Sequence, residues 1–195
     1  LEKIPNKSLM NKKAFAVNHK IAEELSREGY YKEALKILFN LYKSAEQNKK
    51  SNIATYIANN YYYLNQYKNA EYYYQKSIDY ANSKEKINAI NNLAVLKLNL
   101  KKYTETETLL NSVDIKNASL YALAGVYSTF AELEKIKGNL KKSESYYQKI
   151  IEIDKKDVNK QNLANDYLAM ATMYFDFKKY DSAEKKFIES YNILI

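Results

Sequence analysis

Few side chains in this chain of 195 residues could perform catalysis or hold a metal ion. His19 is the only histidine and cysteine is absent, so a transition-metal site would have to rely on carboxylates around one imidazole. We interpret the acidic pairs Glu23–Glu24 and Glu105–Glu107 as solvated faces rather than catalytic dyads. The glycines are isolated and no nucleophile motif is present, which argues against a phosphate-binding loop and a Ser–His–Asp triad. The sequence therefore predicts no catalytic residue, no metal site and no cofactor, and we expect that the protein is not an enzyme.

Asn and Tyr side chains suggest a different chemistry, which is the binding of another polypeptide. The chain contains 21 tyrosines and is also rich in asparagine. An Asn amide offers both a hydrogen-bond donor and an acceptor, so it can pair with the N–H and C=O groups of an extended peptide. Tyr contributes a flat contact surface and a hydroxyl group, as binding surfaces commonly do. Whether these side chains share a surface depends on the elements that carry them.

The composition favours helices over sheets. Apolar residues make up 46% of the chain, as in a globular protein, but only three glycines and one proline are present. Closely spaced strands need turns that favour Gly and Pro, so their scarcity indicates helices. No apolar run approaches the roughly 18 residues that a membrane span needs. Since the chain opens at Leu1 rather than Met, we expect a processed form or a fragment.

The charge and the cysteine content set limits on partner and compartment. The formal net charge is +8, but Arg27 is the only arginine and the lysines are spread along the chain. Arg supplies the planar fork that grips phosphate through two hydrogen bonds, so its near absence disfavours nucleic acid as a partner. The absence of cysteine excludes disulfides and is compatible with a cytoplasmic or an exported, periplasmic location.

A pattern of 12 residues recurs five times, at residues 27–38, 63–74, 99–110, 136–147 and 176–187, with spacings of 36, 36, 37 and 40 residues. The fifth column of the pattern contains Tyr31, Tyr67, Tyr103, Leu140 and Tyr180. The eighth column is small and contains Ala34, Ala70, Thr106, Ser143 and Ala183. The twelfth column is large and contains Leu38, Tyr74, Leu110, Tyr147 and Phe187. This agreement predicts an array of structural repeats.

Upstream of each copy, an alanine recurs at the same spacings and directly follows a bulky apolar residue. These alanines are Ala22, Ala58, Ala94, Ala131 and Ala171. Two closely crossing helices need such a pair, because the small side chain admits the neighbouring backbone and the large one fills the adjacent gap. We therefore predict that the repeat core contains the five alanines together with Tyr31, Tyr67, Tyr103 and Tyr180.

Each repeat unit is expected to contain two helices, because apolar residues follow helical spacing on both sides of a break. The breaks fall at Gly29, Asn65, Lys101, Gly138 and Lys178. Gly and Asn are the residues that best tolerate the left-handed conformation that ends a helix. The predicted helices span 11–27 and 31–47, 51–64 and 67–81, 85–99 and 103–112, 117–137 and 140–153, and 158–177 and 180–195.

This pattern of bulky and small residues, a break, and then aromatic and small residues resembles the tetratricopeptide repeat. The resemblance implies an all-α fold, a right-handed α-solenoid of antiparallel helix pairs, with residues 14–195 as a single domain after a lead-in at 1–13. The expected units are about 14–48, 49–83, 84–117, 118–157 and 158–195. The sequence departs from the family in lacking the early Trp and the closing Pro, and in an expected longer first helix near 117–137.

The resemblance also implies that the first helix of each unit lines a concave groove for an extended segment. The groove residues that it implies here are Asn52, Tyr56, Asn59, Tyr63, Asn88, Asn91, Asn92, Asn99, Asn165 and Thr172. His19 and Glu23 take corresponding positions in the first unit. Some family members grip the acidic tail of a heat-shock chaperone with Lys, Asn and Arg residues from three units. Of the corresponding positions here only Asn59 fits that pattern, and Glu23 would repel a carboxylate, which disfavours that partner class.

We therefore expect a protein- or peptide-binding scaffold, such as the sensory or interaction segment of a larger bacterial signalling protein. One alternative is a helical-repeat RNA-binding protein similar to the pentatricopeptide family, against which stand the variable spacing and the single arginine. Another is a self-association module, because helix 180–195 has an apolar face and no polar capping helix follows it.

Overall fold

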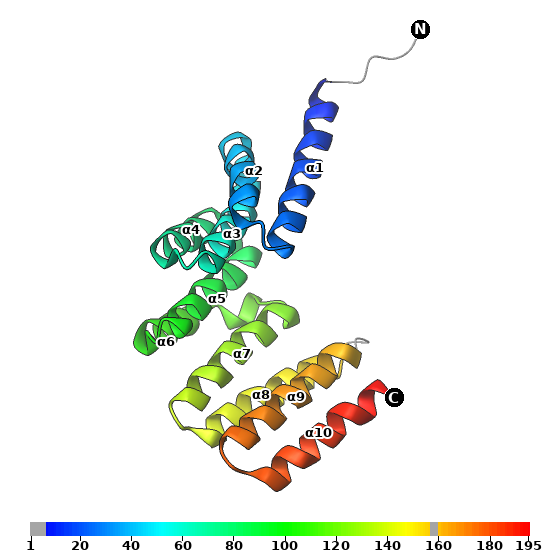
Figure 1. Ribbon diagram of the computed structural model, residues 1–195. Helices are drawn as coiled ribbons and strands as arrows, with labels where there is room; N and C mark the ends of the chain where they lie inside the picture. Colours follow the sequence, from blue (N-terminus) through cyan, green and yellow to red (C-terminus); the bar gives the residue numbers. More distant parts are fainter. Residues whose placement is uncertain (1–6, 157–159) are drawn as a thin grey trace. The chain divides into compact units, whose positions relative to one another are not determined.

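The computed structural model describes residues 7–156 and 160–195, with side chains described for 13–156 and 160–195. Within these residues there are ten α-helices, one short 3-10 helix and no strand. Consecutive helices lie side by side as antiparallel pairs, as Figure 1 shows for α3 with α4 and for α9 with α10. The predicted all-α arrangement of antiparallel helix pairs is confirmed. Residues 1–6 of the expected lead-in lie outside the described part.

Each of the five repeats contributes a first and a second helix. The first helices are α1 (Lys7–Arg27), α3 (Gln47–Tyr63), α5 (Ser83–Asn99), α7 (Leu120–Ile136) and α9 (Lys160–Asp176). The second helices are α2 (Tyr31–Ser44), α4 (Tyr67–Tyr80), α6 (Tyr103–Asn111), α8 (Leu140–Asp154) and α10 (Tyr180–Leu194). The 3-10 helix η1 (Ile115–Asn117) lies between α6 and α7.

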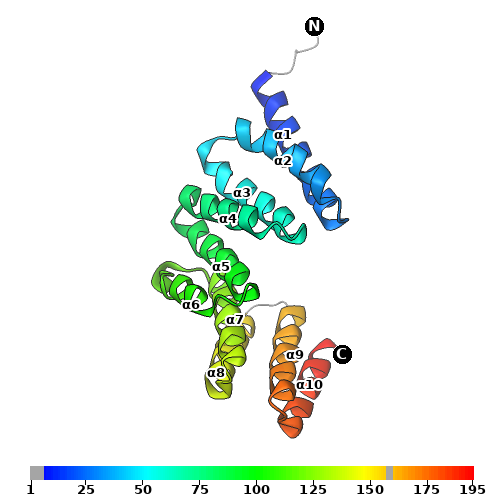
Figure 2. The same ribbon diagram turned by 60° about the vertical axis from the view of Figure 1, so that its left-hand side comes forward.

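The chain divides into two compact units, residues 1–96 and 97–195, and α5 runs across the division. In the first unit, α1, α2 and α3 bury a core that includes Ala34, Leu38 and Ile57. In the second unit, α7 to α10 bury a core that includes Tyr147 and Met173. Figure 2 shows the helices of both units from a second direction.

The turns inside the helix pairs share one backbone geometry. Gly29 and Gly138 have φ of 86° and 80°, and Asn65, Lys101 and Lys178 have φ of 58°, 59° and 59°. In all five turns, the next N–H donates to the carbonyl five residues earlier, for example from Gln66 to Tyr61 at 2.9 Å and from Lys179 to Tyr174 at 2.9 Å. This is the Schellman termination, which supplies partners for the last carbonyls of a helix. The five predicted breaks are confirmed.

The second helices begin at the predicted residues, but one prediction about the first helices is wrong. No longer first helix occurs near 117–137, because α7 has 17 residues, as α3, α5 and α9 do. The largest spacing, 40 residues, reflects the link of residues 155–159 between α8 and α9. The connection between α6 and α7, residues 112–119, is also long and offsets the short α6 of nine residues. There Asp114 caps η1 by accepting from the N–H of Lys116, and Ser119 caps α7 by accepting from that of Ala122. The Ser119 cap explains why α7 begins at Leu120.

The repeat columns differ in how deeply they are buried. All five repeat alanines, Ala22, Ala58, Ala94, Ala131 and Ala171, are at most 1% exposed. Tyr31, Tyr67 and Tyr103 are half-buried. Tyr180 is 58% exposed, so its prediction as a core residue is wrong. Its ring instead makes an edge contact with Phe175, which is itself exposed, at 5.6 Å between centroids.

Candidate functional site

A polar cluster joins α1 to α3 in the first unit. His19 Nε2 lies 3.0 Å from Asn52 Oδ1, and His19 Nδ1 lies 3.5 Å from a carboxylate oxygen of Glu23. The hydroxyl of Tyr56 donates to the same Glu23 oxygen, and the ring of Tyr56 makes an edge contact with His19 at 5.0 Å. Two of the predicted groove residues, Asn52 and Tyr56, are thus held in fixed orientations by residues of α1, the first helix of the preceding repeat.

The hydroxyl of Tyr56 remains protonated throughout the physiological range. Burial and, secondarily, the hydrogen bond to Glu23 raise the pKa of Tyr56 to about 12. Both causes act against the phenolate, because burial disfavours charge and the neighbouring carboxylate repels it. Tyr56 therefore remains a hydrogen-bond donor to the Glu23 carboxylate over this range.

Two further predicted residues of α3 are also engaged within the protein. The hydroxyl of Tyr74 in α4 donates to Asn59 Oδ1 at 2.5 Å, so this amide oxygen already has a partner. The ring of Tyr63 stacks on that of Tyr31 at 5.1 Å between centroids, although Tyr63 is 59% exposed. Tyr63 therefore offers an exposed ring edge whose position is set by stacking.

The predicted residues of α5 in the first unit behave differently. Asn88 is exposed, and Asn91 and Asn92 are half-buried. Asn91 is engaged with other groups of the protein. Asn88 and Asn92 have no hydrogen-bond partner among the residues described for this chain. Because they are one turn apart at i and i+4, their amides lie on the same face of the helix.

A cavity of about 530 Å³ lies beside this polar cluster in the first unit. Its lining comes from α1, α3 and α5 and includes Phe15, His19, Lys49, Asn52 and Glu85. The ammonium of Lys49 lies 4.8 Å from the centre of the Phe15 ring, so the wall combines an apolar surface with charge. Glu85 is one turn before Asn88 and two turns before Asn92 on the same side of α5, so the two free amides continue along this helix from the wall of the cavity.

The remaining predicted groove residues lie in the second unit. Asn165 is exposed and its Oδ1 accepts from Gln161 Nε2 at 3.1 Å. Thr172 is exposed and its hydroxyl donates to the Leu168 carbonyl at 3.0 Å. Asn99, at the end of α5, is exposed and is engaged with another group. The partners of Asn165 and Thr172 both lie on α9 itself, and both side chains are exposed, so a ligand can reach them.

Two buried charges were missed by the sequence analysis. Lys97 is 5% exposed and its ammonium lies 2.6 Å from Glu105, while Glu134 is 4% exposed and accepts from Asn139 Nδ2 at 2.7 Å. Both residues stand three places after a repeat alanine, where Tyr61 and Tyr174 occur in other units. Charged residues in an aromatic column were the signal that could have revealed them.

The described residues contain no group of three or more His, Asp or Glu side chains that could hold a metal ion. None of the described helices combines the length and the apolar character that a membrane span requires. We refer to the surface of α3 and α5 that carries Asn52, Tyr56, Tyr63, Asn88 and Asn92 as the first-unit face. It offers hydrogen-bonding groups and an exposed ring, beside a cavity wall of mixed charge.

The helix pairs and the turns between them give the described part of the chain a tetratricopeptide-like helical-repeat fold. The resemblance predicted from the sequence is confirmed at the level of the fold. No family model matches the sequence, and no curated protein matches it either.

Several solved structures share this fold. A kinesin light chain of Podosopora anserina, with nearly identical tetratricopeptide-like repeats, is 14% identical with a TM-score of 0.69, over 93% of this chain and 95% of that chain. BtubC from P. vanneervenii is 13% identical with a TM-score of 0.70, over 88% of this chain and 76% of that chain. A Rap protein complexed with competence and sporulation factor is 15% identical with a TM-score of 0.74, over 92% of this chain and 54% of that chain.

Proposed function

We propose that this protein is a protein- or peptide-binding scaffold that holds an extended segment on the first-unit face of α3 and α5. The observation that carries this proposal is the pair of free amides at Asn88 and Asn92, beside a cavity of about 530 Å³. An amide with no partner inside the protein is available to a ligand, and it offers one donor group and one acceptor.

The spacing of the two amides fits an extended peptide. Residues at i and i+4 of a helix are separated by about 6 Å along its axis. An extended chain repeats every two residues, over about 6.6 Å, with the same face of its backbone toward a neighbour. Asn88 and Asn92 can therefore pair with backbone groups two residues apart on the ligand, independently of the ligand's side chains.

The rest of the face supplies preorganised contacts. Asn52 and Tyr56 are held by His19 and Glu23, so binding a ligand there costs little side-chain entropy. Tyr63 adds an exposed ring that stacking already orients. The Rap protein of similar fold is complexed with competence and sporulation factor in its solved structure. As part of the proposal, we extend the binding of a partner molecule from that protein to this chain.

The experiment begins with selection of binders from a displayed library of random 12-residue peptides against the whole chain. A selected peptide is then titrated into the wild-type protein and into Asn88→Ala/Asn92→Ala. Loss of two hydrogen bonds should weaken binding by about tenfold or more. Helical content should be unchanged, because neither amide has a partner among the described residues.

The matched control is Asn40→Ala/Asn192→Ala, which removes two exposed asparagines from second helices. This variant should bind the selected peptide as tightly as the wild type does. Equal affinity of the Asn88→Ala/Asn92→Ala protein and the wild type for every selected peptide would refute the proposed binding face.

A further inference from the structure

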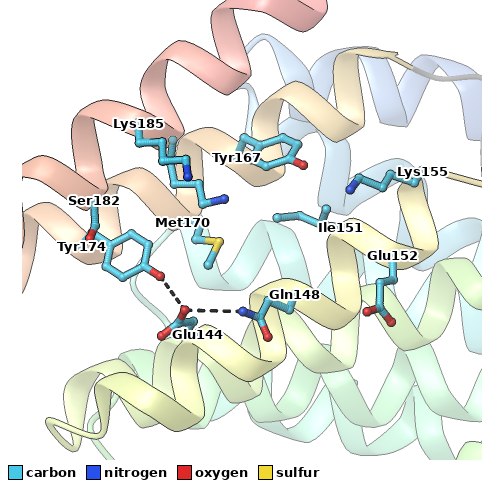
Figure 3. A pocket seen from close by; sticks show the side chains of 11 residues that line it. Glu144, Gln148, Ile151, Glu152, Lys155, Tyr167, Met170, Tyr174, Ser182 and Lys185 are labelled. Atoms are coloured by element: carbon cyan, nitrogen blue, oxygen red, sulfur yellow. Dashed lines mark hydrogen bonds between the residues drawn. The ribbon is translucent and has the colours of Figure 1, made fainter.

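A second cavity, of about 400 Å³, lies in the second unit between α8 and α10, and α9 forms its floor. Figure 3 shows Glu144 and Gln148 on α8, Met170 and Tyr174 on α9, and Lys185 on α10 around this space. Met170 is buried, and Tyr167 and Ile151 extend the apolar part of the lining. We refer to this space as the α8/α10 groove.

The repeat register explains why the α8/α10 groove is open. In the first unit, the equivalent space between α2 and α4 is filled by rings. Phe39 lies 5.7 Å from Tyr73 and 6.2 Å from Tyr61, and Tyr61 stacks on Tyr73 at 5.8 Å, all between centroids. By the repeat alignment, Gln148 stands in the place of Phe39 and Lys186 in the place of Tyr73.

Relative to the first unit, the floor of the groove has an aromatic residue at the same place, whereas the walls have polar residues where the first unit has rings. Tyr174 stands in the place of Tyr61, and its hydroxyl donates to Glu144 at 2.6 Å, as the dashed line in Figure 3 marks. Glu144 itself replaces Leu35, which is 7% exposed in the first unit. The groove therefore has an apolar floor without the two rings that cover the equivalent floor in the first unit.

The charges of the walls are only partly compensated. Glu144 accepts from Tyr174 and from Gln148 Nε2 at 3.4 Å. Lys186 pairs with Glu189 at 2.8 Å and lies over the Tyr167 ring at 5.2 Å. Among the described residues, no ion pair involves the other three charged groups of the lining. These are Glu152, Lys155 and Lys185. Glu144 has no cationic partner among the described residues either, so two carboxylates and two ammonium groups of the lining lack a partner of opposite charge. Glu144 already accepts two hydrogen bonds, whereas the ammonium of Lys185 is exposed on α10 and can pair with a carboxylate of an occupant. The net charge of +8 on the chain also favours an acidic partner.

The missing rings favour an occupant that inserts one side chain. The groove is open to solvent, and its space of about 400 Å³ lies over a floor that has lost the two rings covering the equivalent floor of the first unit. An extended segment can follow such a groove with one large side chain directed at the floor. An aromatic side chain would replace the missing rings and contact Met170 and Tyr167, because sulfur–aromatic and ring–ring contacts are both favourable.

We propose that the α8/α10 groove is a second binding site, which takes an extended segment of a partner protein with an aromatic residue flanked by acidic residues. The aromatic side chain lies against Met170 and Tyr167, and a flanking carboxylate pairs with Lys185. The site is formed by residues other than those of the first-unit face and does not depend on the function proposed for that face.

The probe is a fluorescein-labelled Gly/Ser decapeptide with a central Asp-Phe-Asp, titrated with the whole chain at 0.15 M salt and followed by anisotropy. Saturable binding is expected for this peptide. Peptides with Asp-Ala-Asp or Lys-Phe-Lys at the centre should bind about tenfold more weakly, since each lacks the anchor or the matching charge. Equal binding of all three peptides would overturn the proposal.

Two protein variants test the place of binding. Gln148→Phe/Lys186→Tyr supplies the rings of the first unit and fills the groove, so it should abolish binding of the Asp-Phe-Asp peptide. Lys185→Glu keeps the space but reverses the charge, and it should weaken binding by about tenfold while improving that of the Lys-Phe-Lys peptide. Lys185 is exposed, so this variant decides the matter even if the filled variant does not fold.

The charge control is Lys141→Glu, an exposed position of α8 that does not line the cavity. It should bind as the wild type does, and so should Asn88→Ala/Asn92→Ala, which separates this site from the first-unit face. Wild-type affinity in Lys185→Glu would refute the groove as a peptide site. A wild-type protein that dimerises in sedimentation while the filled variant is monomeric would instead assign the groove to a second copy of the chain.

Discussion

The seam between α2 and α4 and the seam between α8 and α10 occupy the same place in the repeat but are built from different chemistry. In the first unit, Phe39, Tyr61 and Tyr73 fill the seam with rings. In the second unit, Gln148 and Lys186 replace two of those rings, and a cavity of about 400 Å³ remains. A repeat fold thus tolerates the loss of rings on its second helices as long as the small and bulky residues of its first helices are kept.

The largest effect is expected in the twelfth column of the repeat, where the two units differ in burial. Leu38 of α2 is fully buried, whereas Phe187 of α10 is 40% exposed. Leu38→Ala should lower the free energy of unfolding by about 3 kcal/mol, because it removes a buried side chain and leaves a cavity. Phe187→Ala should cost about 1 kcal/mol, since much of its surface is already in water.

Urea denaturation of the two single variants and the wild type measures both values through the change in midpoint at a constant slope. Equal costs at the two positions would contradict the difference in packing between the units.

The next effect concerns the seams themselves. Tyr73 contacts Phe39, Tyr42 and Tyr61 through its ring. Tyr73→Ala should therefore cost about 2 kcal/mol of unfolding free energy. Lys186→Ala, at the equivalent position of the open groove, should cost only about 0.5 to 1 kcal/mol, because it removes one half-buried ion pair with Glu189 and the contact with the Tyr167 ring but no filled aromatic cluster. Thermal unfolding of both variants by circular dichroism makes the comparison, and a destabilisation by Lys186→Ala as large as that by Tyr73→Ala would contradict it.

The smallest predicted effect depends on pH. Asp166 stands in the place of Ile53, which is 1% exposed in the first unit, and one of its carboxylate oxygens is buried without a hydrogen bond. Burial and, secondarily, the nearby charge of Asp154 raise the pKa of Asp166 to about 7 from its ordinary 3.8. Between these two pH values the folded state holds a proton that the unfolded state has released. Stability therefore falls as pH rises from about 4 to about 7 and stays low above that.

Asp166→Asn removes this titration. It should raise the free energy of unfolding at pH 8 by about 1 kcal/mol, after allowance for solvent screening of a half-exposed group. At pH 4 the two proteins should be equally stable, because Asp166 is then protonated in the folded state. Urea titrations at both pH values measure the difference, and an identical shift at pH 4 and pH 8 would assign the effect to packing rather than charge.

The sequence was sufficient for the repeat and its turns because local rules govern them. The second helices begin at Tyr31, Tyr67, Tyr103, Leu140 and Tyr180 as predicted, since a left-handed residue ends the preceding helix in each unit. The geometry holds even at Lys101 and Lys178, where no Gly or Asn favours it, which means that the surrounding helix packing enforces the turn.

The surface features depended on contacts between helices and could not be predicted in the same way. The sequence suggested the same role for Asn59 and Asn88, yet only Asn59 is engaged by a tyrosine from the next helix. The exposure of Tyr180 and the α8/α10 groove depend on which rings a neighbouring helix supplies. The choice of residues on one helix does not reveal whether a partner side chain reaches them.

The first helices α3, α5, α7 and α9 have the same length of 17 residues, while the second helices of the array range from 9 to 15 residues. After α1, variation in length is therefore confined to the second helices and the links that follow them. For protein engineering, this makes the link between α6 and α7 a natural place to splice in an affinity tag or a fluorescent reporter. The first helices would then keep their constant length, and the reporter would be inserted in a link whose length already differs between repeats.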